Sequence, residues 1–167
     1  MDKYQHTLEK LENNTAKRSI TLVLEGALIG VLAGLTAVLY RYCLTYAESG
    51  LYAVLDFIRG NAAVTALWFA ALILMGCIVA KIVKWEPMAA GSGIPQVSGE
   101  VRGYLDQSFW RVILAKFTGG TLSIFGGLSL GREGPSIQLG AMAAKSYSRL
   151  RNYDKTTEIG LLSCGAG

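Results

Sequence analysis

Two short glycine-rich stretches hold the residues whose types and spacing could do chemistry. Residues 91–95 read Gly-Ser-Gly-Ile-Pro, and residues 131–135 read Gly-Arg-Glu-Gly-Pro. In each stretch the glycines permit a tight, exposed backbone, and the proline suits the first turn of a helix. Each stretch is therefore predicted to present a helix N-terminus, where unpaired N–H donors carry about half a positive charge. In a soluble protein, such helix ends bind phosphate or sulfate.

Both stretches adjoin apolar segments, and this setting indicates an anion pathway through a membrane. Irregular backbone is tolerated at membrane depth only where it is buried in protein or lines a watery cavity. Broken helices that aim their N-termini at a central anion are one solution that transporters use. Chloride has to be bound weakly enough to leave again. Backbone N–H groups and the Ser92 hydroxyl meet that need, because they carry no full charge.

Glu133 places a carboxylate at the head of the second predicted helix, where an anion should sit. When ionised, it can compete for the anion site, and when protonated, it becomes neutral and can swing aside. One residue could in this way couple the passage of an anion to a proton. The alternative is a capping carboxylate that stabilises the start of the helix, typically by about 0.3–1 kcal/mol.

Two basic residues near these stretches each have a functional and a structural interpretation. Arg132 would hold chloride too tightly as a direct ligand, so we expect a structural salt bridge near the rim or a long-range attraction of anions. Lys116 lies inside an apolar run, where an ammonium group is costly unless it faces protein or water. Lys116 is therefore a functional candidate, and a role as a structural partner is the alternative.

The composition indicates a membrane protein. Of the 167 residues, 51% are hydrophobic and 17% are charged, and the mean hydropathy is +0.36. A soluble domain usually carries about 25% charged residues. The net charge of +4 comes from scattered Lys and Arg without a basic run, which argues against nucleic-acid binding. The three cysteines and the single histidine match no metal-site spacing, so neither a metal nor a cofactor is expected.

Two apolar runs are long enough to cross a bilayer. Residues 20–40 hold one charge and residues 62–80 hold none, and about twenty residues cover the roughly 30 Å hydrocarbon core. The polar residues 1–18 are expected to form a cytoplasmic amphipathic helix at the membrane surface, and residues 41–61 an outside loop. Basic residues flank the start of the first span and the end of the second, so the N-terminus is expected on the cytoplasmic side.

The remaining chain has the pattern of shorter and broken helices. Proline and glycine interrupt residues 85–107 and leave room for one short helix from near Pro95. A third apolar stretch covers residues 109–130, and a further helix is expected at 135–150. Residues 159–167 begin another apolar segment that is too short to cross a bilayer. We therefore predict an all-α, polytopic membrane domain at 19–167 that is truncated at its C-terminal end.

Taken together, the two glycine-rich stretches closely resemble motifs of the CLC family of chloride channels and proton-coupled chloride transporters. They occur in the family's order beside the expected hydrophobic segments, and the second continues as Ser-Ile-Gln-Leu-Gly at 136–140. The resemblance covers nearly all of the chain. It implies most of the first of two inverted repeats of a CLC-type fold, with tilted and broken helices. It also implies a homodimer in the lipid bilayer of the plasma or inner membrane.

The resemblance implies roles for individual residues of the candidate anion site. Ser92 matches the serine whose hydroxyl contacts the central chloride, and its presence implies chloride over nitrate, since proline there is the nitrate-preferring pattern. Glu133 matches the gating glutamate that takes part in proton coupling. The amides that face the anion in the family correspond to Gly93, Ile94 and Gly134. Arg132 completes the candidate set.

Proton-coupled chloride exchange, with chloride and protons as the transported species, is the leading interpretation. A passive voltage- or pH-gated chloride channel is the alternative, because Glu133 occurs in both groups of the family. A non-transporting membrane fragment or partner subunit is the second alternative. An enzyme is not expected, since neither glycine-rich stretch matches the nucleotide-binding patterns G-x-x-x-x-G-K-[ST] or G-x-G-x-x-G and no strand is predicted before either.

Overall fold

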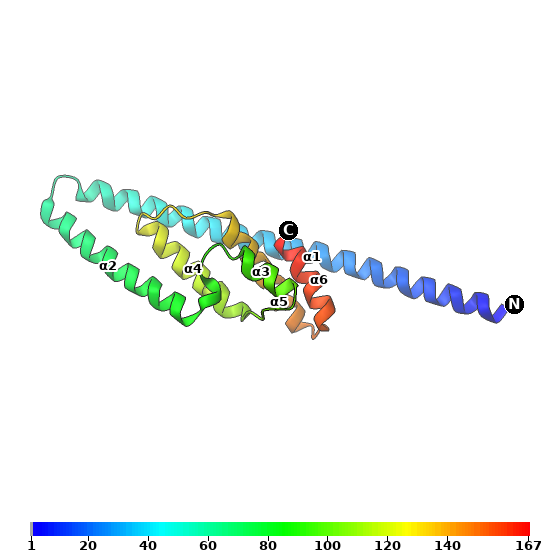
Figure 1. Ribbon diagram of the computed structural model, residues 1–167. Coiled ribbons are helices and arrows are strands. Elements are labelled where there is room, and N and C mark those ends of the chain that lie inside the picture. Colours follow the sequence, from blue (N-terminus) through cyan, green and yellow to red (C-terminus); the bar gives the residue numbers. More distant parts are fainter. Residues whose placement is uncertain (1) are drawn as a thin grey trace.

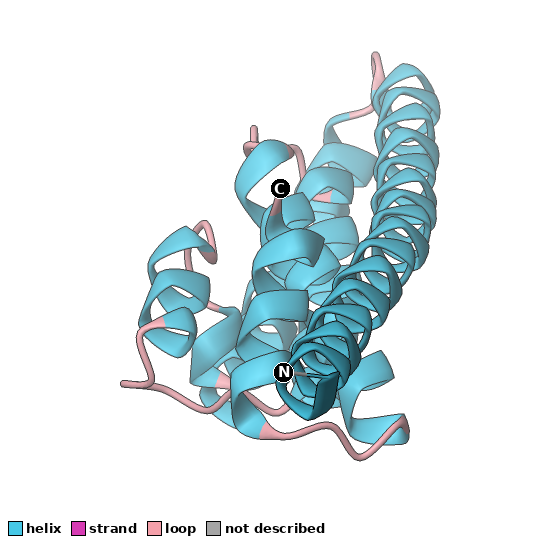
Figure 2. Ribbon diagram, turned by 90° about the vertical axis from the view of Figure 1, so that its right-hand side faces the viewer, coloured by secondary structure: helices cyan, strands magenta, loops and turns pink. Residues whose placement is uncertain are grey.

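The computed structural model describes the backbone of residues 2–167 and the side chains of residues 21–167. Within this range the chain is helical, with no strand (Figure 2), which confirms the predicted all-α class. The predicted amphipathic character of residues 1–18 lies outside the described side chains. The elements are α1 (Asp2–Ile58), α2 (Ala62–Trp85), the short 3-10 helix η1 (Pro87–Ala89), α3 (Ile94–Val101), α4 (Phe109–Phe125), α5 (Glu133–Leu150) and α6 (Lys155–Ala166).

Helix α1 is longer than the sequence pattern predicts. The prediction of an outside loop at 41–61 is wrong, because the helix continues and only residues 59–61 connect it to α2. The stretch contains no proline. Tyr40, Leu44 and Ala47 recur at helical spacing and are buried against residues of α4 and α5. Packing of this face stabilises the helical conformation beyond residue 40, where the charged residues alone suggested a loop.

Helices α1 and α2 are both long and apolar enough to cross a membrane. The qualifying part of α1, Thr21–Ile58, has 38 residues, and α2 has 24. At about 1.5 Å per residue, α2 is roughly 36 Å long, whereas Thr21–Ile58 is roughly 57 Å long and exceeds the hydrocarbon core of about 30 Å. Helix α1 therefore has to tilt or to project beyond the core. Almost no residue in the apolar windows of the two helices is buried, as expected of surfaces that face lipid.

Helix α5 lies at the centre of the helices that position the glycine-rich stretches. It contacts α1, α3, α4 and α6. Figure 1 shows α3, α4, α5 and α6 together on one side of α1. More than half of the α5 residues are buried. Ala141 and Met142 pack with Val112 of α4, Leu162 of α6 and Val97 of α3. Helix α5 is therefore held in place by four neighbouring helices.

Glycines allow α5 and α6 to approach closely. A Cβ on Gly140 would lie 3.3 Å from the Gly165 carbonyl carbon, and a Cβ on Gly165 would lie 2.7 Å from the Ala144 Cβ. Small residues permit such approaches between membrane helices. We expect Gly140→Ala to destabilise the full-length protein by about 1–3 kcal/mol, because overpacking forces the two helices apart. Thermal unfolding in detergent measures this change.

The matched control for this prediction is Gly160→Ala on α6, whose added methyl group would meet no atom within 4 Å. Alanine is the better helix former, so this control should be neutral or slightly stabilising. Equal melting temperatures for Gly140→Ala and the unsubstituted protein would contradict the close packing of α5 on α6.

Candidate anion site

Helices α3 and α5 begin at the two glycine-rich stretches. Gly93 is the N-cap of α3 and has a φ of +92°, a conformation that glycine adopts without strain. Helix α5 begins at Glu133, the third residue of the second stretch. Pro95 and Pro135 both lie in the first turn of their helices, where a missing N–H costs no helix bond. Both predicted helix N-termini are therefore present.

Ser92 and Gly134 bring these two helix ends into direct contact. A Cβ on Gly134 would lie 2.7 Å from both the Cβ and the carbonyl oxygen of Ser92. The first turn of α5 can approach the Ser92 turn only because position 134 has no side chain. The unpaired N–H donors at the two helix ends consequently lie next to one another.

The Ser92 hydroxyl is suited to donate a further hydrogen bond. Its Oγ accepts from the backbone N–H of Ile94 at 3.4 Å. Because this bond uses an oxygen lone pair, the O–H hydrogen stays available to a second acceptor. An anion at the two helix ends would be such an acceptor. Gly93 and Ile94 form the turn behind Ser92.

A cavity of about 370 Å³ opens beside this contact. Both glycine-rich stretches line it, and residues of α2 and α4 add mostly apolar walls with a few polar groups, the usual composition of a small-ligand site. The members that come from the two stretches are Gly91, Ser92, Gly131, Gly134 and Pro135. Both predicted motifs therefore line the same cavity.

Lys116 reaches the same cavity from α4. Its side chain is 5% exposed, and Nζ donates a 2.7 Å hydrogen bond to the Gly91 carbonyl oxygen. The salt bridges among the described side chains do not include Lys116. This contact gives Lys116 a structural partner in the first glycine-rich stretch. A charged ammonium group at the wall would also attract anions, and that role stays a prediction.

Arg132 and Glu133 lie at the start of α5 and outside the lining of the cavity. The Arg132 guanidinium donates to the Glu48 carboxylate at 2.7 Å, with the two side chains 39% and 40% exposed. This salt bridge connects the start of α5 to α1. Glu133 is exposed and precedes Gly134, so it lies one residue from the contact with Ser92. Its part in gating stays a prediction.

A buried polar network that the sequence analysis missed lies behind the site. It consists of Gln138, Gln107, Glu100 and Lys145, all of them buried. Gln138 follows Gly134 by four residues, so both residues lie on the same face of α5. A polar residue at that spacing was an available signal, as were Glu100 and Lys145, two charges beside apolar segments. Their pairing could not be read from spacing, because it joins α3, α5 and a loop.

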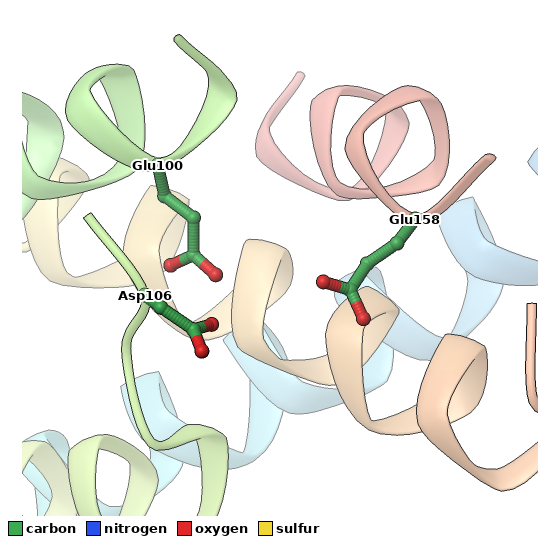
Figure 3. A group of neighbouring side chains, drawn as sticks. All are labelled: Glu100, Asp106 and Glu158. Carbon is green, nitrogen blue, oxygen red and sulfur yellow. The ribbon is translucent and has the colours of Figure 1, made fainter. Parts of the chain in front are cut away.

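Three carboxylates lie close together at this network, from α3, the loop after it and α6 (Figure 3). Glu100, Asp106 and Glu158 have oxygens within 4.8 Å of one another, which could hold a cation. Each already forms a salt bridge with at least one of three bases, Lys145, Arg149 and Lys155. The hydrogen bond from Lys145 lowers the pKa of the Asp106 carboxyl. The cluster is an ion-pair network with balanced charge.

The apolar helices, the two helix N-termini and their shared cavity define a class of protein. It is a helical membrane protein in which two short helices begin at the same cavity. The model of the voltage gated chloride channel family matches residues 71–167, which include both glycine-rich stretches. The chain belongs to this family, and the predicted family resemblance is confirmed.

Several H(+)/Cl(−) exchange transporters named ClcA are similar to this chain. The Vibrio campbellii protein is 31% identical over 153 residues, which cover 89% of this chain and 32% of the relative. The Vibrio cholerae serotype O1 protein is 32% identical over 162 residues, covering 90% and 33%. The Salmonella arizonae protein is 31% identical over 128 residues, covering 74% and 27%. The chain spans about a third of the length of the curated relatives it matches.

Proposed function

We propose that the protein to which this chain belongs moves chloride across a membrane in exchange for protons, as a homodimer. The observation that carries the proposal is the contact between Ser92 and Gly134, which joins two helix N-termini beside one cavity. The relatives named as H(+)/Cl(−) exchange transporters support the same activity.

In this proposal, chloride binds between the N-terminal ends of α3 and α5. The N–H groups of Gly93 and Gly134, the Ser92 O–H and the Ile94 N–H, which chloride would share with the Ser92 Oγ, supply partial positive charge without a full counter-charge. Binding of this kind is weak enough for the ion to leave. Lys116, held by the Gly91 carbonyl oxygen, raises the local concentration of anions through its charge.

Glu133 is the proposed gate and proton carrier. As the first residue of α5 it is exposed, so its side chain can change rotamer without repacking the core. The ionised carboxylate competes with chloride for the positive ends of the helices. Protonation removes that charge, releases the carboxyl group from the site and lets chloride pass. Each cycle of the gate then moves a proton against the flow of chloride.

Reconstitution of the full-length protein into vesicles tests this function. An imposed chloride gradient should drive protons uphill, which a chloride electrode and a pH electrode record together. Chloride flux without proton movement would contradict exchange and support the passive channel. Vesicles that contain correctly assembled protein and show no chloride flux would contradict transport altogether.

Replacing Ser92 with proline should raise the permeability of nitrate relative to chloride. The substitution removes the O–H donor, and a hydrogen bond to a charged group is worth about 1.5–3 kcal/mol, so we expect roughly a tenfold change in the ratio. Flux of the two anions through vesicles measures it. Ser98→Ala, which alters an exposed serine of α3 six residues further along the chain, is the matched control. An unchanged ratio in Ser92→Pro would remove Ser92 from the anion site.

A further inference from the structure

We propose that Gln138 is a positioning residue for the Ser92–Gly93 turn, and that the buried ion pair between Glu100 and Lys145 anchors it. The inference rests on the proposed function, because the turn that Gln138 positions is the proposed chloride ligand. It adds four residues that lie behind the anion site to those that would contact the ion. Each step of the connection is a contact between buried groups.

The side chain of Gln138 lies directly against Gly93. A Cβ on Gly93 would be 2.7 Å from the Gln138 Cβ and 2.8 Å from the Gln138 Cδ. Gly93 therefore has to be glycine for two reasons, its φ of +92° and the space that Gln138 already fills. The turn that presents Ser92 rests on this glutamine. A change in the position of Gln138 would move the turn.

Two hydrogen bonds hold the Gln138 amide in one orientation. Its Nε2 donates to the Gln107 Oε1 at 2.6 Å and to the Met88 carbonyl oxygen at 2.9 Å. Since the Met88 carbonyl can only accept, flipping the amide would place two acceptors together. The Gln138 Oε1 therefore faces Gly93, where it is buried without a partner among the described residues. The Oε1 makes no hydrogen bond to the turn among the described residues, so Gln138 supports Gly93 by packing, with its amide held by the two bonds of Nε2.

The contacts continue from Gln107 to a buried ion pair. The Gln107 backbone N–H and Nε2 both donate to the Glu100 Oε2, at 3.3 and 2.9 Å. Lys145 Nζ in turn donates to the Glu100 Oε1 and to the Gln107 carbonyl oxygen. Glu100 is 0% exposed and Lys145 is 1% exposed. In such a setting, loss of one partner leaves an uncompensated charge, so the pair strongly favours one relative position.

This buried polar network joins the two helices that begin at the anion site. Glu100 belongs to α3, which starts after Gly93, and both Gln138 and Lys145 belong to α5, which starts just before Gly134. The ion pair therefore sets how α3 lies along α5. That placement determines the contact between Ser92 and Gly134, where the two helix N-termini meet.

The test uses the full-length protein with Gln138→Met, which keeps a side chain of similar size and removes the amide. Amide hydrogen exchange of residues 91–97 reports the turn, and calorimetric titration with chloride reports anion affinity. We expect exchange about tenfold faster at 91–97 and chloride affinity about tenfold weaker. The matched control is Ser148→Ala, which changes an equally buried residue of α5 outside the network and should alter neither measurement.

Glu100→Leu combined with Lys145→Met removes the anchor without leaving a buried charge. Replacement of a buried pair by apolar residues is often neutral for stability, so this variant serves if Gln138→Met does not fold. It should show the same faster exchange at 91–97 and the same loss of affinity.

The outcomes separate the positioning role from the proposed function. Unchanged exchange at 91–97 in these variants overturns the positioning role, whatever happens to chloride. Faster exchange with unchanged chloride affinity overturns it as well, because the turn then does not determine binding. An unsubstituted protein that binds no chloride overturns the proposed function instead, and the exchange data still decide whether Gln138 holds the turn.

Discussion

Glu133→Ala should leave chloride flux through the full-length protein and abolish the proton movement that accompanies it. The substitution removes the carboxylate that competes with the anion at the start of α5, so chloride can enter without a protonation step. The first turn of α5 then holds no carboxyl group to carry the proton. Simultaneous chloride and pH electrode traces from reconstituted vesicles measure both fluxes, and the proton signal should fall to the level of protein-free vesicles.

Two further variants make this result specific to Glu133. Glu133→Gln, which keeps the shape of the protonated side chain, should also abolish proton movement. Glu48→Gln removes the carboxylate that pairs with the neighbouring Arg132 and should retain proton coupling. Proton pumping that persists in Glu133→Ala would contradict the gating role. If Glu133 only caps α5, its loss lowers stability by about 0.3–1 kcal/mol and leaves the ratio of protons to chloride unchanged.

A methyl group at position 134 should damage the anion site directly. In Gly134→Ala the added Cβ would lie 2.7 Å from the Cβ and the carbonyl oxygen of Ser92, so the two helix ends have to separate. Overpacking typically costs about 1–3 kcal/mol, and if this cost falls wholly on the anion site it corresponds to a loss of chloride affinity of about fivefold to 150-fold. Calorimetric titration of the full-length protein with chloride measures the change.

Gly76→Ala on α2 is the control for this substitution, since its methyl group would meet no atom within 4 Å. It should bind chloride as tightly as the unsubstituted protein. An unaltered affinity in Gly134→Ala would show that chloride does not bind at the contact between the two stretches, and the proposed site would then be wrong. The contrast between the two glycines depends only on what surrounds each of them.

The sequence by itself determined the membrane character, the family and the position of both helix starts at the site. These features are local, because long apolar runs, glycine-rich turns and first-turn prolines act over a few neighbouring residues. The motifs at 91–95 and 131–135 therefore predicted to within two residues where α3 and α5 begin. Local charge misled in one place, at 41–61, where the burial of Tyr40, Leu44 and Ala47 extends α1 through a polar stretch.

Only the tertiary structure decided which residues meet. The contact of Ser92 with Gly134 depends on how α3 lies along α5, and so does the buried network from Gln138 to Lys145. Lys116 was recognisable as a costly charge in an apolar run, but its partner, the Gly91 carbonyl oxygen, is 25 residues away. Buried polar groups take whichever partners helix packing brings within reach. The partner of each buried polar group depends on residues far apart in the chain, so local sequence patterns did not predict it.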